Sequence, residues 1–195
     1  LALRKFYELM KNEPAPMNGS DLFGVLYGSQ FKFDREKMPA EIDALREKIE
    51  KEYAEGEKPA RKKRILLNGC PSSGAPMKVV KSIEANGGNV VCYENCGGAK
   101  SVDRLIDENA DDIYQAIAER YLAIGCSVMT PNPNRYELLG RLLEEYQIEG
   151  VVEMTLQACH TYNIEAKSIE KFVTEKGIPY MHVETDYSQT DAGQL

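Results

Sequence analysis

Residues 65–74 form the stretch that decides the fold, and they read Ile65-Leu66-Leu67-Asn68-Gly69-Cys70-Pro71-Ser72-Ser73-Gly74. A short apolar run of strand length ends in a loop rich in Gly, Pro and Ser, and a helical pattern over residues 75–85 follows directly. Units that lead from a strand through a short loop into a helix predict parallel strands joined by right-handed crossovers.

The same alternation continues along the chain. The predicted strands are Ile65–Asn68, Asn89–Glu94, Gly150–Thr155 and Pro179–Glu184. The predicted helices are Ala75–Ala85, Ser101–Leu122 with a break near Asn109, Asn134–Tyr146 and Asn163–Lys176. This pattern predicts an α/β fold, with a Rossmann-like sheet of four or slightly more parallel strands flanked by helices. In such sheets ligands bind beyond the carboxyl ends of the strands.

The first third of the chain has a different, helical pattern. Its clearest apolar stripe repeats at a spacing of three to four residues and comprises Met38, Ile42, Leu45, Ile49 and Tyr53. We therefore predict a helical N-terminal segment and linker over residues 1–60 and a Rossmann-like domain over residues 61–195. The stripe is expected to pack on this sheet or on a part of the protein outside this chain.

Composition excludes several classes of protein. The 195 residues carry 24 Lys and Arg against 31 Asp and Glu, a net charge of −7, which argues against a nucleic-acid partner. The one basic run, residues 61–64, is interpreted as a solvated linker. No apolar run approaches the ~18 residues of a membrane span, and no signal-peptide pattern follows Leu1. We expect a cytoplasmic protein without a membrane partner, and Leu1 and Leu195 suggest a piece of a longer chain.

The positions of the five cysteines are the most informative feature. Cys70, Cys96 and Cys159 each come directly after a predicted strand, and Cys126 lies at a junction between a helix and a loop. Because the carboxyl ends of parallel strands share one edge of the sheet, these thiols are expected to gather there. Cys92 lies inside a strand and is predicted to belong to the core.

Several kinds of site are compatible with these thiols. Cys96, Cys126 and Cys159, with His160 as a candidate fourth ligand, could bind tetrahedral zinc, although structural zinc sites usually use closely spaced pairs. Thiolates that arrive from separate loops suit an iron–sulfur cluster at least as well, and a dithiol redox site is a third option. Spacing alone leaves zinc and a cluster open. The loop glycines Gly97 and Gly98 are expected to let backbone amides approach a ligand closely.

Three polar side chains are weaker candidates for catalysis. His160 adjoins a candidate ligand, and Glu184 and Asp186 lie at the end of the last predicted strand, where paired carboxylates could transfer protons. Carboxylates at strand ends are more often caps and solvated loop residues, so the sequence does not assign them a catalytic role.

Five sequence blocks resemble a known family. The residues concerned are Asn68-Gly69-Cys70-Pro71, Glu94-Asn95-Cys96-Gly97-Gly98, residues 125–132, Ala158-Cys159-His160-Thr161-Tyr162-Asn163 and Glu184-Thr185-Asp186-Tyr187-Ser188. From about Ile65 to Leu195 the chain resembles the C-terminal half of the 2-hydroxyacyl-CoA dehydratase D-component family, which includes benzoyl-CoA reductase subunits and double-cubane cluster proteins. The blocks around Cys96 and Cys126 are closer to the double-cubane branch.

The resemblance implies an iron–sulfur cluster, either 4Fe-4S or double-cubane. It assigns Cys159 as the C-terminal ligand, Cys96 and Cys126 as the additional ligands of the double-cubane branch, and Cys70 as a lesser candidate. The family's first domain, which supplies further ligands, is not in this chain. The cluster is therefore expected to be incomplete or absent in this piece, and the isolated piece is expected to be inactive.

The resemblance also implies a reaction and partners. An ATP-hydrolysing iron–sulfur activator delivers low-potential electrons to a subunit that pairs with a second dehydratase-type subunit, as a homodimer or heterodimer. The reaction is radical dehydration of an (R)-2-hydroxyacyl-CoA or, in the double-cubane branch, reduction of small molecules. The alternative is a non-catalytic Rossmann-like domain with a structural zinc or free thiols.

Overall fold

The computed structural model describes residues 1–71, 74–191 and 193, so Ser72, Ser73 and Leu195 lie outside the described residues. One four-stranded sheet forms the centre of the molecule, with strand order β2-β1-β3-β4 and every adjacent pair parallel. The strands are β1 (Lys63–Gly69), β2 (Gly88–Tyr93), β3 (Gly150–Leu156) and β4 (Tyr180–Thr185). The predicted parallel α/β sheet flanked by helices is confirmed.

The decisive stretch forms the central strand β1 and the loop after it. Gly69 has φ +98°, and a Cβ at this position would lie 2.1 Å from the carbonyl oxygen of Met154 on β3. Only glycine tolerates this close approach. The following amide, of Cys70, donates to the same carbonyl at 2.8 Å. The chain therefore leaves β1 while still held against β3.

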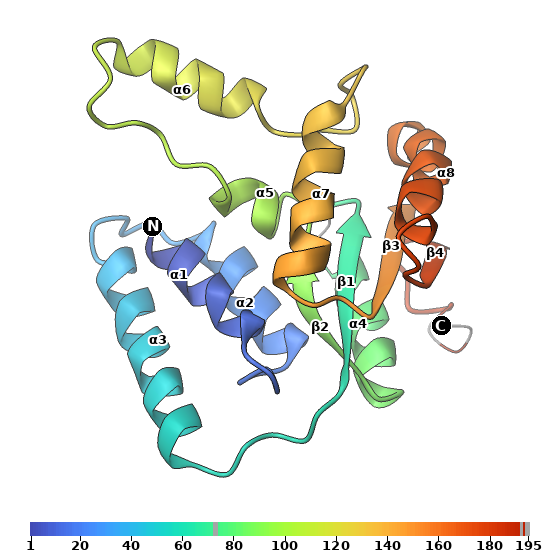
Figure 1. Ribbon diagram of the computed structural model, residues 1–195, viewed down its shortest axis with the longest axis horizontal. Coiled ribbons are helices and arrows are strands. Elements are labelled where there is room, and N and C mark those ends of the chain that lie inside the picture. Colours follow the sequence, from blue (N-terminus) through green and yellow to red (C-terminus); the bar gives the residue numbers. More distant parts are fainter. Residues whose placement is uncertain (72–73, 192, 194–195) are drawn as a thin grey trace.

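Three helices serve as crossovers between the strands. The helices α4 (Ala75–Ala85), α7 (Pro133–Glu145) and α8 (His160–Thr174) follow β1, precede β3 and follow β3, respectively. Figure 1 shows α7 in front of the sheet and α4 behind it. Since the chain passes from β1 outward to β2 and then returns to the other side of β1, the direction of the fold reverses between β1 and β3. This switch point is where ligands bind in open α/β sheets.

The N-terminal segment covers the β2 edge of the sheet (Figure 1). It consists of α1 (Ala2–Glu8), the 3-10 turn η1 (Leu9–Lys11), α2 (Gly19–Ser29) and α3 (Met38–Glu55). The Tyr7 hydroxyl accepts a hydrogen bond from the Tyr93 amide at 2.7 Å and lies 3.0 Å from the Tyr93 carbonyl oxygen. Phe6, Tyr7 and Leu22 belong to the same buried cluster as the strands. A division of the chain at residue 60 stays a prediction.

The predicted helix over residues 101–122 is wrong in its first half. The structure has a single turn, α5 (Ala99–Val102), then an irregular segment, and α6 (Ile113–Leu122). Asp112 caps α6, because its carboxylate accepts hydrogen bonds from the amides of Tyr114 and Gln115. The helix α8 also begins three residues earlier than predicted, at His160.

The helix α6 projects away from the sheet (Figure 1), and none of its residues is buried. Among the described residues, no helix combines the length and the apolar character that crossing a membrane requires.

Candidate functional site

Two of the candidate thiols meet at the switch point of the sheet. Cys70 follows β1 and is buried, whereas Cys159 follows β3 and is half-buried. The Leu156 amide at the end of β3 donates to Cys70 Sγ at 3.4 Å, so the Cys70 thiol lies beneath the loop that carries Cys159. The left-handed backbone of Ala158, with φ +63°, directs this loop. A non-glycine residue in that region is uncommon and is often found at functional sites.

The environments of these two thiols shift their pKa values in opposite directions. Burial raises the pKa of Cys70 to about 12, which keeps this thiol protonated at neutral pH. Burial also opposes ionisation of Cys159, but the Tyr162 amide and the Thr161 hydroxyl stabilise its thiolate. The Cys70 thiol adds a further hydrogen bond, and the net effect lowers the pKa of Cys159. The pair therefore combines a thiolate-forming sulfur with a proton-donating one.

A second pair of thiols, Cys96 and Cys126, lies near the start of α8. Although Cys96 is an exposed residue, loss of water around its sulfur raises its pKa, the Lys100 ammonium opposes this, and Cys126 adds to the increase. Both thiols also act on the pKa of buried Tyr162, which burial itself raises most. The two sulfurs therefore belong to one electrostatic neighbourhood.

A hydroxyl contact connects the loops of the two pairs. Ser127 Oγ donates to Thr161 Oγ1 at 3.3 Å, and Thr161 Oγ1 lies 3.7 Å from Cys159 Sγ. The Asn132 side chain also donates to the Cys126 carbonyl oxygen at 2.9 Å. Three thiol-bearing loops, those of Cys70, Cys126 and Cys159, are therefore joined by hydrogen bonds at one edge of the sheet.

Directly below the thiols is a buried ionic network centred on Arg135. Its guanidinium contacts Glu94 at 3.2 Å and Glu153 at 3.1 Å, and it also pairs with Glu165. Arg135, Glu94 and Glu153 have no exposed side-chain surface. Charges at such depth are maintained only by close pairing.

The two central carboxylates of this network respond differently to burial. Burial alone would raise the pKa of Glu94, but the Lys100 ammonium and the Arg135 guanidinium lower it below its usual value. The pKa of Glu153 is raised, because burial outweighs Arg135 and the hydrogen bond that Tyr180 donates at 2.7 Å. Glu94 therefore remains a carboxylate, and of these two residues Glu153 takes up a proton first on acidification.

Three polar atoms at this end of the sheet are buried without a hydrogen-bond partner among the described residues. They are Asn68 Oδ1, Glu94 Oε2 and Lys100 Nζ. The Lys100 ammonium lies 2.9 Å from Glu94 Oε1 as an ion pair, but the contact lacks hydrogen-bond geometry. Unsatisfied buried polar groups are few in native proteins, so their concentration here makes this edge a candidate ligand site.

The charged members of this site were not predicted from the sequence. Arg135 shares the buried face of α7 with Leu138, Leu139 and Leu142. A charged residue within an apolar stripe is therefore the sequence feature that could have indicated its burial. For Lys100 the sequence offers no comparable pattern, because the single-turn helix α5 is too short to show one.

The weaker catalytic candidates have other partners. His160 is exposed at the first turn of α8. Glu184 accepts a hydrogen bond from Asn163 at 2.9 Å. Hydrogen bonds from Ser188 lower the pKa of Asp186, and its carboxylate lies 3.8 Å from the buried Lys78 ammonium. These contacts make Asp186 part of a clamp around Lys78, and a proton-transfer role for any of the three stays a prediction.

Two further expectations concern Cys92 in β2 and the glycines of the loop that follows this strand. Cys92 has no exposed surface and lies 3.0 Å from the Tyr7 hydroxyl, so its predicted core position is confirmed. The amides of Gly97 and Gly98 donate to the Asn95 side chain and carbonyl at 3.0 and 2.9 Å. These bonds close the loop on itself, and the close approach of backbone amides to a ligand in this loop stays a prediction.

The thiols do not complete a metal site by themselves. Within residues 1–71, 74–191 and 193, no three His, Cys, Asp or Glu side chains are grouped closely enough to bind a metal ion. Clusters and structural zinc usually take four protein ligands. The described side chains thus do not by themselves form the four-ligand set of a cluster or of a structural zinc site.

The fold and the site define a Rossmann-like domain with cysteines on the loops after its strands, above a buried ionic network. Comparison with known proteins identifies the family more closely. The sequence model of "2-hydroxyglutaryl-CoA dehydratase, D-component" matches residues 1–195, and the chain belongs to this family. The match also includes the N-terminal helices, which the resemblance from Ile65 onward did not cover.

Two curated relatives support this assignment. The chain is 47% identical over 195 residues to the "Putative dehydratase subunit YjiM" of Escherichia coli (strain K12), covering all of this chain and 51% of that protein. It is 27% identical over 197 residues to a benzoyl-CoA reductase subunit of Thauera aromatica, covering 92% of this chain and 44% of that protein. The chain spans about half the length of these relatives.

Proposed function

We propose that this chain supplies cysteine ligands to an iron–sulfur centre of a 2-hydroxyacyl-CoA dehydratase-type subunit, and that the remaining ligands lie outside this chain. The observation that carries the proposal is the meeting of Cys70 and Cys159 at the switch point of a sheet in a protein of this family. Cys96 and Cys126 are proposed as further ligands, as in the double-cubane branch.

Three features of the chain support this role. The lowered pKa of Cys159 favours the thiolate, the form of cysteine that binds iron. Its loop is held by contacts to β1 and to the Cys126 loop, so the sulfur is positioned before any metal arrives. The Lys100 ammonium lowers the pKa of Cys96 against the effect of burial, and it is the cation that stabilises negative charge there.

The reaction and the partners follow from the family and are part of the proposal. The full-length protein is proposed to dehydrate an (R)-2-hydroxyacyl-CoA together with a second dehydratase-type subunit, after an ATP-hydrolysing iron–sulfur activator provides the electron. In the double-cubane alternative it reduces small molecules. The cysteines of this chain are proposed to bind and orient the iron–sulfur centre. We also propose that the protein is located in the cytoplasm.

The test is anaerobic reconstitution of the full-length protein with iron and sulfide. We expect a brown protein whose visible absorption bleaches on reduction. Cys159→Ala is expected to lose most of the bound iron, and Cys96→Ala and Cys126→Ala are expected to lose part of it. Cys92→Ala is the matched control, because Cys92 is buried within β2, and its iron content should equal that of the wild type.

Other results would contradict the proposal. A full-length protein that stays colourless and binds stoichiometric zinc would favour the non-catalytic alternative, with loss of folding on chelation as its signature. Iron content that is unchanged by Cys159→Ala would remove Cys159 from the ligand set.

A further inference from the structure

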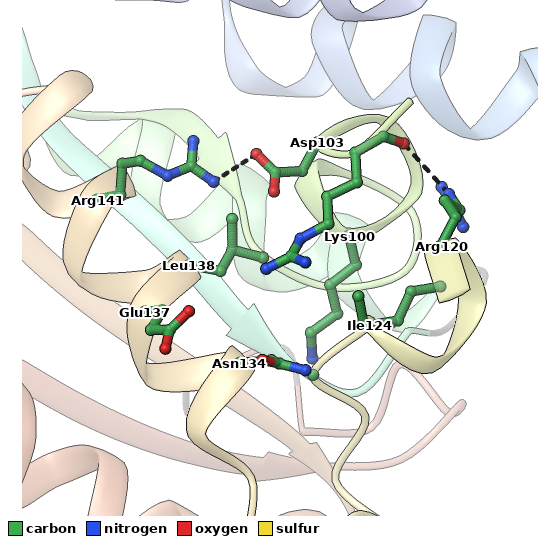
Figure 2. Close-up of a pocket in the computed structure, with 11 residues that line it drawn as sticks. Lys100, Asp103, Arg120, Ile124, Asn134, Glu137, Leu138 and Arg141 are labelled. Atoms are coloured by element: carbon green, nitrogen blue, oxygen red, sulfur yellow. Dashed lines mark hydrogen bonds and ion pairs between the residues drawn. The ribbon is translucent and has the colours of Figure 1, made fainter. Parts of the chain in front are cut away.

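A charged cleft lies between α5, α6 and α7, and Lys100 links it to the neighbouring thiol site. Its cavity volume is about 80 Å³. Figure 2 shows side chains from all three segments turned toward it. The charged residues that line it are Lys100, Arg104, Arg120, Arg141, Asp103 and Glu137, so four cations face two carboxylates. This excess of positive charge distinguishes the cleft from the rest of a chain whose net charge is −7.

The arginines of the cleft differ in how far they are already paired. Arg141 is neutralised, because it pairs with Asp103 at 2.6 Å and with Glu145 at 3.3 Å. Arg120 donates only to carbonyl oxygens, those of Ser101 at 2.6 Å and of Arg104 at 3.2 Å, and keeps its full charge. The Arg104 guanidinium makes no ion pair or hydrogen bond within the described part of the chain. Arg104 and Arg120 therefore retain charge and donors for a ligand.

The inner end of the cleft has a buried cation. Lys100 is 3% exposed, and its ammonium is paired with Glu94 at 2.9 Å and has no other polar partner among the described residues. Figure 2 shows the ammonium end of Lys100 beside Asn134. Asn134 lies in the first turn of the 13-residue helix α7, where unpaired amides carry partial positive charge. A buried donor with unmet hydrogen-bonding capacity indicates a ligand at this position.

We propose that this cleft binds a phosphoryl group. Guanidinium groups present planar pairs of donors that match phosphate oxygens, and an ammonium adds a compact charge at the inner end. Donors that approach from three segments suit a tetrahedral dianion better than a planar carboxylate. Glu137 is the carboxylate in the cleft with no ion pair among the described residues, and it opposes anion binding. The proposal does not depend on the iron–sulfur function.

The test is titration of the full-length protein with inorganic phosphate at constant ionic strength, followed by calorimetry. Phosphate is expected to bind in the millimolar range or tighter, and Arg104→Ala is expected to weaken binding about fivefold through loss of a charge-assisted contact. Lys51→Ala is the matched control, since it removes one exposed positive charge on α3, away from the cleft. Its affinity for phosphate should equal that of the wild type.

A charge-neutralising substitution separates binding from a general structural effect. Glu137→Gln should tighten phosphate binding about threefold, because it removes the opposing charge, whereas mere damage to the fold would weaken binding. The melting temperatures of all variants without phosphate should be equal. Absence of phosphate binding, or affinities that are unchanged in both Arg104→Ala and Glu137→Gln, would overturn the proposal.

Two sources of the phosphoryl group can be distinguished with ADP and coenzyme A in the same assay. Binding of either at least tenfold tighter than inorganic phosphate, with the same loss in Arg104→Ala, would assign the cleft to a nucleotide-bearing ligand. Equal affinities would assign it to free phosphate. Nucleotide binding that does not respond to Arg104→Ala would place the nucleotide elsewhere and would overturn that assignment of the cleft.

Discussion

The two ends of the central sheet each contain a buried arginine, but the surroundings of the two arginines differ. At the amino end, Arg64 donates to the carbonyl oxygens of Tyr146, Asn12 and Met10 and to Glu13, at distances of 2.6 to 3.0 Å. Among the described residues, no buried side-chain polar atom around Arg64 lacks a hydrogen-bond partner. At the carboxyl end, Arg135 contacts three carboxylates, and three buried polar atoms nearby have no hydrogen-bond partner among the described residues.

This difference distinguishes a structural end from the end that is proposed to bind a ligand. A satisfied arginine that ties together a helix end, a turn and a strand is sufficient for stability. A site that leaves donors and acceptors unmet is less stable than it could be, and this cost is typical of positions that bind a ligand. Three experiments test this difference between the two ends.

The largest effect is expected for Arg135→Met. Removal of the guanidinium leaves Glu94 and Glu153 buried with much less compensation, which is expected to cost about 3–5 kcal/mol of unfolding free energy. Arg64→Met is the matched variant. It should lower the free energy of unfolding by about 2–3 kcal/mol, because it mainly leaves neutral carbonyl oxygens without their hydrogen-bond donor. Urea unfolding at pH 7 measures both, and a larger loss for Arg64→Met would invert the comparison.

The next effect concerns the reactivity of the thiols. Cys159 has a lowered pKa and is half-buried, whereas burial raises the pKa of Cys92 inside β2. Because the thiolate is the reactive form, metal-free native protein should be alkylated by iodoacetamide at Cys159 about 100-fold faster than at Cys92. Mass spectrometry of digests gives both rates. In denatured protein the two rates should converge, and equal rates in native protein would be inconsistent with the structure.

The smallest effect is expected at Glu149, at the amino end. A hydrogen bond from Lys63, with further bonds from the Arg64 amide and Arg61, lowers the pKa of Glu149 to about 2. A carboxyl whose pKa is lower in the folded than in the unfolded state stabilises the fold above its ordinary pKa, 4.5 here, and loses this contribution as the pH falls through about 2. Because the residue is close to solvent, the contribution is at most about 1 kcal/mol.

Glu149→Gln checks this pH dependence. The difference in unfolding free energy between wild type and variant should be complete at pH 7, decrease below the ordinary pKa and nearly disappear toward pH 2. A difference that grows on acidification would show that Glu149 is not held as a carboxylate. High salt should reduce the difference at pH 7.

The sequence was most informative where Gly and Pro punctuate the chain. All four strands lie within two residues of their predicted bounds, because β-branched and apolar runs end at such residues. The helix predicted from Ser101 failed in its first half, because the polar and acidic residues 103–112 form an irregular segment that is longer than the break predicted near Asn109, and Asp112 starts a new helix. A side-chain cap of this kind overrides a weak helical pattern.

The candidate site was only partly predictable. The positions of Cys70 and Cys159 after strands placed them at one edge of the sheet, and topology explains why these two meet. The ionic network was not foreseen, because pairs such as Glu94 and Arg135 are 41 residues apart and charged residues are normally expected at the surface. Burial of a charge depends on its distant partners, which a single sequence does not reveal.

The contact of Tyr7 with Tyr93 also bears on how the chain avoids aggregation during its synthesis. An open edge strand offers its backbone amides and carbonyls to any other extended chain. Tyr7 occupies one such amide of β2, and it belongs to a helix that leaves the ribosome well before β2 does. When β2 joins the sheet, the segment that covers its edge is already present, so the order of elements along the chain protects the nascent protein.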